Sequence, residues 1–262
     1  MKLRCNSWLF VPAVKKLLGK IEGCKADAVI IDLEDAVLDA EKDSALKLTS
    51  EFLKGYDYEK DIYIRINPDR LDGEVLRLDK YAIKGYMLPK TESAEDIKKL
   101  SGLTQGKCII ALVETPLGIA NLKEIAQSEI AAIAFGAEDY TTQCGIKNKD
   151  EFLVYPKSKI IAYAKAYGKL AIDTISLNIT DKDRYAVEVQ TTKDFGFDGK
   201  LAIHPMQVEA INSVYTDDVE YYRIIVNKYE KCGEGVLNIN GTVFEKPHIE
   251  RMKRRIQEYE KN

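Results

Sequence analysis

A chain of 262 residues with 45% hydrophobic content has enough apolar material for one large α/β domain and an appendage. Its 39 basic and 42 acidic residues give a net charge of -3, which argues against a dedicated nucleic-acid-binding protein. No apolar stretch is as long as the roughly 18 residues that a membrane span needs, so the sequence predicts neither a span nor export. Five scattered cysteines without a CxxC pair favour a reducing, cytoplasmic setting over a disulfide framework or a zinc site.

Short apolar runs rich in β-branched residues recur along the chain. Each run is continuous rather than alternating, which is typical of strands that are buried on both faces of a parallel sheet. The runs predict eight strands, at residues 8–12, 28–34, 61–67, 85–90, 108–114, 131–139, 170–176 and 200–205.

Amphipathic segments separate these runs. Segment 93–103 starts with a serine and carries an acid three residues later, which is a helix-start signature. Segments 158–168 and 183–196 each end at a glycine, as many helices do. Eight strand–helix alternations favour a (β/α)8 TIM barrel, and the absence of a GxGxxG or Walker loop removes the usual nucleotide-binding reason for an open sheet. A doubly wound open sheet stays as the alternative, because sequence alone does not show closure.

The pattern changes after residue 215. Residues 217–233 predict a helix that ends at Gly233, and residues 248–262 predict a charged helix. Between them, segment 236–247 carries an Asn-Gly pair flanked by β-formers, which indicates a hairpin. We therefore expect a barrel domain at residues 1–215 and a helix–hairpin–helix extension at 216–262, which we expect to pack on a neighbouring subunit.

Polar residues stand where the predicted strands end, and in a TIM barrel these ends carry the catalytic groups. Burying unpaired carboxylates is costly, so we expect the acids to face a shared polar cavity with cations nearby. The residues at these ends are Asp32, Glu34, Asp35, Arg65, Asn67, Lys90, Glu114, Thr115, Glu138, Asp139 and His204.

Glu114 and Asp139 lie 25 residues apart, which is one strand–helix unit, so they should project from neighbouring strands. Two such carboxylates suit Mg²⁺, which completes its octahedron with water and substrate oxygens. A 2-oxo acid could chelate the ion, and Arg65 could bind the acid's carboxylate bidentately. Taken singly, each acid is equally well explained as a helix cap or half of an ion pair. His204 is better explained as a structural hydrogen-bonding residue than as a base.

A family resemblance covers nearly the whole chain. It is carried by the stretches "SWLFVPA" (7–13), "ADAVIIDLEDAV" (26–37), "YIRIN" (63–67), "YMLPKTES" (86–93), "ALVETPLGIANLKEIA" (111–126), "FGAEDY" (135–140) and "GFDGKLAIHPMQVEAIN" (196–212). On these stretches the chain resembles the citrate lyase beta-subunit-like proteins of the HpcH/HpaI aldolase/citrate lyase superfamily.

The resemblance implies a TIM barrel that assembles into a homo-oligomer, a trimer or a hexamer. It implies Mg²⁺ as cofactor, held by Glu114 and Asp139, with Glu114 also next to the substrate. Arg65 would bind the carboxylate of the oxo acid, and Glu34 and Asp35 would act with it in catalysis by orienting Arg65 and metal-bound water.

The chain also departs from its relatives. Its only histidines are His204 and His248, which disfavours an aldolase that acts on free aldehydes. Relatives carry an Asp-x-Pro motif that reaches a neighbouring subunit's site, where this chain has Glu245-Lys246-Pro247. Glu245 is expected either to reach that site as a base, with Val243 and Phe244 buried against the neighbour, or to be a solvent-exposed turn residue.

The substrates follow from the same resemblance. Relatives place cations for the phosphates of CoA in the first loop, where this chain has Lys15, Lys16 and Lys20. We expect a Mg²⁺-dependent lyase that cleaves a 3-hydroxyacyl-CoA, such as citramalyl-, malyl- or citryl-CoA, into an acyl-CoA and a 2-oxo acid. The alternatives are a citrate lyase beta subunit acting on a citryl group on acyl carrier protein, and a non-catalytic binding paralogue. The sequence names neither the acyl group nor the oxo acid.

Overall fold

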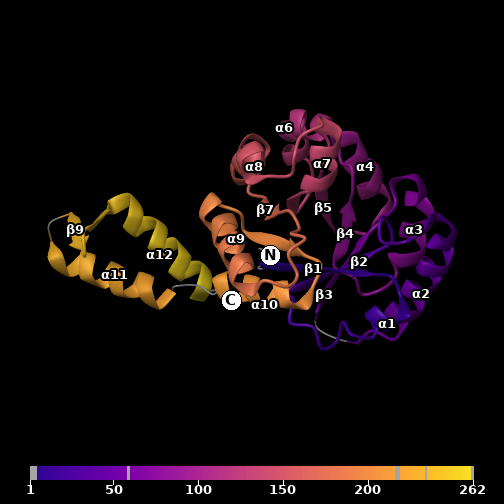
Figure 1. The fold of residues 1–262 in the computed structure, drawn as a ribbon, viewed down its shortest axis with the longest axis horizontal. Helices are drawn as coiled ribbons and strands as arrows, with labels where there is room; N and C mark the ends of the chain where they lie inside the picture. The colour runs from indigo at the N-terminus through magenta and orange to yellow at the C-terminus, as the bar shows by residue number, and fades with distance from the viewer. Residues whose placement is uncertain (1–4, 58–59, 216–218, 234, 261–262) are drawn as a thin grey trace. The chain divides into compact units, whose positions relative to one another are not determined.

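The computed structural model describes residues 5–57, 60–215, 219–233 and 235–260. The chain divides into two compact units, one that ends at Tyr215 and one that begins at Thr216. We describe each unit by itself. Figure 1 follows the chain through both from the N-terminus to the C-terminus.

The first unit is built on a closed barrel of eight parallel strands. Strands pair in chain order, and β8 pairs with β1 to close the ring, with Trp8 opposite Leu201. The TIM barrel prediction is confirmed, and the open sheet is wrong. The strands are β1 (Ser7–Pro12), β2 (Ala28–Asp32), β3 (Asp61–Arg65), β4 (Gly85–Leu88), β5 (Cys108–Val113), β6 (Ala132–Phe135), β7 (Leu170–Asp173) and β8 (Gly199–Ala202).

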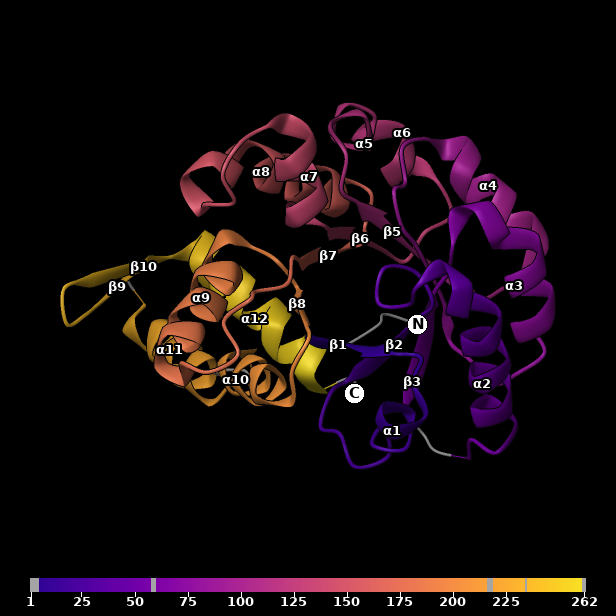
Figure 2. The same cartoon turned by 45° about the vertical axis from the view of Figure 1, so that its right-hand side comes forward.

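Helices and short 3-10 turns connect the strands, and Figure 2 shows α2, α3 and α4 along one flank of the barrel. Helix α4 begins as predicted, with Ser93 and Asp96 forming a capping box. The elements of the first unit besides its strands are α1 (Lys15–Leu18), η1 (Asp39–Glu41), α2 (Lys42–Lys54), η2 (Pro68–Arg70), α3 (Leu71–Leu78), α4 (Ala94–Leu103), α5 (Pro116–Ala120), α6 (Leu122–Gln127), α7 (Ala137–Cys144), α8 (Asp150–Ala166), α9 (Lys182–Phe195) and α10 (Pro205–Tyr215).

Several predicted boundaries differ from the structure. Helix α8 starts at Asp150 rather than at 158, because Pro156 lies inside the helix instead of before it. Most strands stop one to three residues short of the prediction, and β6 ends at Phe135 rather than at 139. Asp139 therefore lies in the first turn of α7 and not at the end of a strand.

The alternation of side chains along each strand separates two cores. Residues that point into the barrel form one cluster, which includes Trp8, Ile30, Tyr63 and Ile110. The residues between them pack under the helices in a second cluster. Because side chains alternate with a period of two, the inward row continues past the apolar core into the polar residues at the strand ends.

A buried ion-pair network lies on the helix side of β7. Asp173 is fully buried, with its carboxylate 3.1 Å from Nζ of Lys200 and 3.4 Å from Nζ of Lys157. The hydroxyl of Thr192 donates a hydrogen bond of 2.7 Å to the same carboxylate. Although burial raises the pKa of Asp173, the two lysines outweigh it and hold that pKa below its ordinary value.

The second unit is the expected helix–hairpin–helix. It contains α11 (Val219–Cys232), β9 (Val236–Ile239), β10 (Thr242–Glu245) and α12 (Lys246–Glu260). Both residues of the hairpin turn, Asn240 and Gly241, have positive φ, as an Asn-Gly hairpin turn requires.

The packing of this unit corrects one expectation. Phe244 is buried in the unit's own small core, beside Ile225, Ile249 and Met252, so it needs no neighbouring subunit to cover it. Val243 stays 48% exposed. No helix within the described residues of either unit is long and apolar enough to cross a membrane.

We expect Asp173→Ala to lower the free energy of unfolding by about 3–5 kcal/mol, because it leaves buried lysines without their partner. Asp150→Ala is the matched control, since exposed Asp150 pairs with the same Lys157 at 2.9 Å and should contribute about 1 kcal/mol or less. Urea unfolding at pH 7 measures both losses.

The contribution of Asp173 to the free energy of unfolding is present above its pKa in the unfolded chain. It is lost as pH falls from about 4 through the lower pKa that Asp173 has in the folded protein. Equal losses in the two variants would contradict this role.

Candidate active site

A cavity of about 370 Å³ lies at the carboxyl ends of the barrel strands. The inward row of each strand supplies its walls: Asp32 follows Ala28 and Ile30 in β2, and Arg65 follows Tyr63 in β3. The cavity is lined by Phe10, Pro12, Asp32, Asp35, Ala36, Arg65, Leu112, Glu114, Phe135, Gly136, Ala137, Glu138, Asp139, Thr174, Ile175, Leu201 and Ile203.

The guanidinium of Arg65 is clamped by a carboxylate from the neighbouring strand. Its Nε and Nη2 donate to the two oxygens of Asp32, at 2.8 and 2.6 Å. Asp32 in turn accepts backbone N–H bonds from Glu34 and Ala36, which fix its orientation. Burial has the largest single effect and lowers the pKa of Arg65, but the hydrogen bond to Asp32 and the charges of Asp32, Glu34 and Asp35 together hold that pKa above its ordinary value.

Two further carboxylates reach the other side of Arg65. Its Nη1 lies 3.1 Å from Glu34 and 3.2 Å from Asp35, so both acids help to orient this arginine. The ring of Phe10 lies 4.8 Å from the guanidinium carbon. Because Asp32 bonds Nε and Nη2, and Glu34 and Asp35 lie beside Nη1, a carboxylate ligand would share the Nη donors of Arg65 with these acids. Bidentate binding of a substrate carboxylate by Arg65 stays a prediction.

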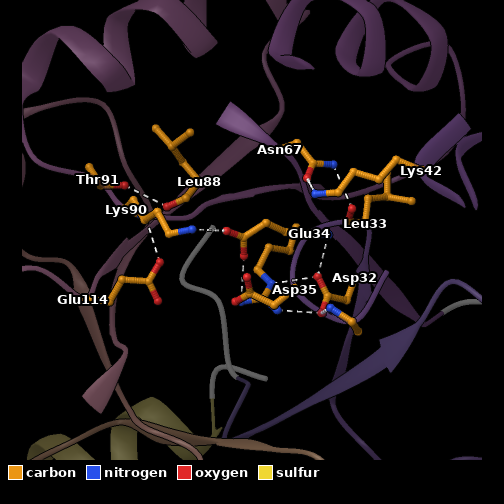
Figure 3. Close-up of polar contacts among 12 residues, drawn as sticks. Asp32, Leu33, Glu34, Asp35, Lys42, Asn67, Leu88, Lys90, Thr91 and Glu114 are labelled. Carbon is orange, nitrogen blue, oxygen red and sulfur yellow. Dashed lines mark hydrogen bonds and ion pairs between the residues drawn. The ribbon is translucent and has the colours of Figure 1, made fainter. Parts of the chain in front are cut away.

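Glu114 is the buried carboxylate of the site, at 4% exposure. Its Oε1 accepts the backbone N–H of Lys90 at 2.8 Å, and Figure 3 shows the pair. Its Oε2 accepts no hydrogen bond from the described residues and lies against Gly136, where an added Cβ would come within 2.5 Å of it. Burial, reinforced by nearby Glu34 and Asp139, raises the pKa of Glu114 to about 8 in the absence of metal, although Lys90 and Arg65 act in the opposite direction.

Asp139 reaches the same cavity from the first turn of α7. Its carboxylate forms no hydrogen bond or ion pair with any described residue, and the helix N-terminus favours its negative charge. The adjacent acid, Glu138, is instead held by a hydrogen bond of 2.8 Å from Asn148. Both oxygens of Asp139 thus stay free for a ligand.

The charges of this cavity fit a divalent cation. Within the described residues, no cluster of three or more His, Cys, Asp or Glu side chains could hold a metal ion. Two free oxygens of Asp139 and one of Glu114 nevertheless suit Mg²⁺, which takes few protein ligands. The cavity walls carry five carboxylates, from Asp32, Asp35, Glu114, Glu138 and Asp139, and among the described residues one cation, Arg65.

Other predicted strand-end residues have structural contacts. Asn67 bonds to buried Glu74 and to the backbone of Leu33, and the hydroxyl of Thr115 caps α5. His204 uses Nδ1 to accept the N–H of Met206 at the start of α10, which agrees with a structural role.

The lysines expected to bind the phosphates of CoA are exposed. Lys15 and Lys16 lie at the start of α1, and Lys20 lies just after it. They do not line the cavity. Glu245 is the exposed last residue of β10, in the second unit.

Sequence reasoning did not assign roles to Asp32, Lys90, Phe10 or Gly136. A signal for Asp32 was present, because it continues the inward alternation of β2, as Phe10 does in β1. The part played by Lys90 depends on its left-handed backbone, with φ of 50°, and no sequence pattern showed that conformation.

Comparisons with known proteins agree on one family. The family model described as HpcH/HpaI aldolase/citrate lyase matches residues 6–205. The citrate lyase subunit beta of Haemophilus influenzae is 34% identical, over 97% of this chain and 96% of that protein. A (3S)-malyl-CoA thioesterase of Cereibacter sphaeroides is 30% identical, over 93% and 90%.

A solved structure extends the likeness to three dimensions. The protein CitE from Mycobacterium tuberculosis, in complex with magnesium, acetoacetate and coenzyme A, superposes with a TM-score of 0.82 at 27% identity. The match covers 98% of this chain and 100% of that one. The chain thus belongs to the HpcH/HpaI aldolase/citrate lyase family and is an enzyme of the lyase type.

Proposed function

We propose that the protein is a Mg²⁺-dependent carbon–carbon lyase that reversibly cleaves a 3-hydroxyacyl-CoA into an acyl-CoA and a 2-oxo acid. The observation that carries this proposal is the placement of Glu114 and Asp139 in one cavity with Arg65. Support comes from Mycobacterium tuberculosis CitE, whose structures hold magnesium with pyruvate or with oxaloacetate.

Glu114 and Asp139 are the residues that would hold the metal. When bound, Mg²⁺ supplies a Lewis acid that stabilises negative charge on the substrate oxygen during C–C cleavage. Glu114 must be ionised to serve as a ligand, which its raised pKa opposes only while no cation is present.

Arg65 would bind the carboxylate of the oxo acid through its Nη1 and Nη2 donors, which it would share with the surrounding acids. Asp32, Glu34 and Asp35 hold the guanidinium in place, so little side-chain entropy is lost when the substrate binds. Phe10 covers one face of the guanidinium and excludes water from that side.

The shape of the cavity favours a small monocarboxylic oxo acid. Part of the cavity wall is apolar, made by Phe10, Leu112, Phe135, Ile175 and Leu201. A methyl group suits this wall, whereas a second carboxylate would meet no free cation among the described wall residues. We therefore place citramalyl-CoA and malyl-CoA, which release pyruvate and glyoxylate, before citryl-CoA, which releases oxaloacetate.

The thioester would extend out of this cavity, because CoA is far larger than about 370 Å³. Exposed Lys15 and Lys16, directly after β1, are our candidates for its phosphates. We further propose a homotrimer or hexamer in which Glu245 completes a neighbour's site.

The second candidate is a citrate lyase beta subunit that acts on a citryl group carried by acyl carrier protein. It is favoured by the Haemophilus influenzae relative at 34% identity and by a Leuconostoc mesenteroides citrate lyase subunit beta at 32%. Genes for alpha and gamma subunits beside this one would favour it.

An activity screen distinguishes these candidate functions. Purified protein with Mg²⁺ is offered citramalyl-, malyl- and citryl-CoA and citryl-acyl carrier protein, and both oxo acid and free thiol are measured. Our proposal expects oxo acid and acyl-CoA from citramalyl- or malyl-CoA without free thiol. Free thiol would indicate a thioesterase, like the Cereibacter sphaeroides relative. Magnesium binding without any reaction would favour a binding paralogue.

Glu114→Gln and Asp139→Asn should each weaken Mg²⁺ binding roughly 100-fold and abolish lyase activity, because each removes one anionic ligand from a site with two. Glu138→Gln is the matched comparison, since this neighbouring acid is held by Asn148. Calorimetry with Mg²⁺ measures the affinity. Unchanged affinity in both ligand variants, or a loss confined to Glu138→Gln, would show the ligand assignment to be wrong.

Arg65→Lys should lower turnover roughly 100-fold or more while circular dichroism stays unchanged. Lysine keeps the charge but loses the planar fork that bonds Asp32. Steady-state kinetics with the best substrate of the screen measure the effect. Wild-type kinetics would instead make Arg65 a structural residue.

A site shared between subunits should be revealed by mixing two inactive variants, Asp139→Asn and Glu245→Ala. Mixed oligomers regain partial activity, because some interfaces then combine an intact metal site with an intact Glu245. Exchange of subunits is confirmed by mass before the assay. Full activity of Glu245→Ala alone, or no recovery after exchange, would rule out the shared site.

A further inference from the structure

Lys90 has a backbone conformation that is rare for its residue type. Its φ is 50°, in the left-handed region, and among the described non-glycine residues it shares this sign only with Asn240 in the hairpin turn. Lysine gains nothing from this conformation locally, whereas asparagine tolerates it. A strained backbone conformation of this kind persists only where the surrounding structure fixes it, and such conformations are enriched at functional sites.

The residues around Lys90 hold the backbone in this shape. Buried Pro89 precedes it, and fully buried Thr91 follows it. Thr91 donates its N–H to Leu112 and its hydroxyl to Leu88. Its carbonyl oxygen lies so close to Gly118 that an added Cβ there would come within 2.5 Å. The turn after β4 is therefore anchored to β5 and α5 on both sides of Lys90.

In this conformation the two ends of Lys90 reach two different carboxylates. The backbone N–H donates to Glu114 at 2.8 Å, and Nζ donates to Glu34 at 2.8 Å. The second oxygen of Glu34 forms an ion pair with Nη1 of Arg65 at 3.1 Å, and it accepts no hydrogen bond from the described residues. Figure 3 shows Lys90 between Glu114 and Glu34.

We propose that Lys90 is a positioning residue that joins the metal-binding half of the site to the arginine half. Its backbone fixes Glu114, and its ammonium fixes Glu34, which in turn pairs with Nη1 of Arg65 in the cavity wall. Lys90 does not line the cavity itself, so it acts through these two carboxylates. The inference rests on the proposed function, since it assumes that Glu114 binds Mg²⁺ and that Arg65 binds the oxo acid.

Because the two contacts come from backbone and side chain, substitution can separate them. Lys90→Gly keeps the N–H and adopts positive φ without strain, but it loses the ammonium. Lys90→Gln keeps the length without the charge, and Lys90→Arg keeps a cation. Lys107→Met is the control, because this partly buried lysine also donates two hydrogen bonds, to Tyr81 and Ile83, but lies before β5, at the opposite end of that strand from Glu114.

Calorimetry with Mg²⁺ alone and then with pyruvate at saturating Mg²⁺ measures both halves. We expect Lys90→Gly and Lys90→Gln to bind Mg²⁺ nearly as wild type but pyruvate roughly tenfold more weakly, the scale of one lost charge-assisted hydrogen bond. Lys90→Arg should restore most of the pyruvate affinity, and Lys107→Met should change neither affinity. Thermal unfolding identifies any variant that does not fold, and the remaining one of the Gly and Gln pair then gives the result.

Wild-type pyruvate affinity in Lys90→Gly or Lys90→Gln would overturn the inference, as would an equal loss of Mg²⁺ and pyruvate affinity. No rescue by Lys90→Arg would overturn it too. A wild-type protein that binds neither Mg²⁺ nor pyruvate would contradict the proposed function itself, and the inference with it. The titration of the wild-type protein thus distinguishes a failure of this inference from a failure of the proposed function.

Discussion

The ion pair between Arg65 and Asp32 allows charged side chains to follow the buried apolar core at the ends of the barrel strands. A guanidinium at 11% side-chain exposure is costly unless its donors are matched, and Asp32 matches two of them across paired strands. Both residues continue the inward rows of their strands above an apolar core. The pair fixes the arginine before any ligand arrives, and it occupies the Nε and Nη2 donors on one edge of the guanidinium.

Around this pair, the acids are unequally matched by cations and hydrogen-bond donors. Glu34 is compensated by Arg65 and Lys90, whereas Glu114 and Asp139 receive one hydrogen bond between them from the described residues. A buried carboxylate that lacks such partners either takes up a proton or attracts a cation. This is why the pKa of Glu114 rises to about 8. Folding stability alone would favour a salt bridge here, so the unpaired acids indicate a site that binds a cation.

The alternating polarity of strands made much of this site predictable. Apolar runs that end in acids located Glu34, Asp35, Arg65 and Glu114, because position along a parallel strand fixes the end of the barrel a side chain reaches. Asp139 was placed on the wrong element, since "AFGAED" continues a strand-like run while Gly136 starts a helix. The left-handed Lys90 and the local burial of Phe244 depend on contacts between distant segments, which residue patterns do not carry.

The cavity also bears on which oxo acid the proposed lyase would release. Releasing oxaloacetate would mean holding two carboxylates, and Arg65 is the one cation among the described residues of the cavity wall. The second would face the apolar wall of Phe135 and Leu201 or an acid, unless a residue outside this cavity supplies a cation. One missing methylene changes discrimination by only about 1–3 kcal/mol, but an unpaired buried carboxylate costs more. Under the proposed function, charge would therefore separate monocarboxylic from dicarboxylic oxo acids more sharply than size would separate pyruvate from glyoxylate.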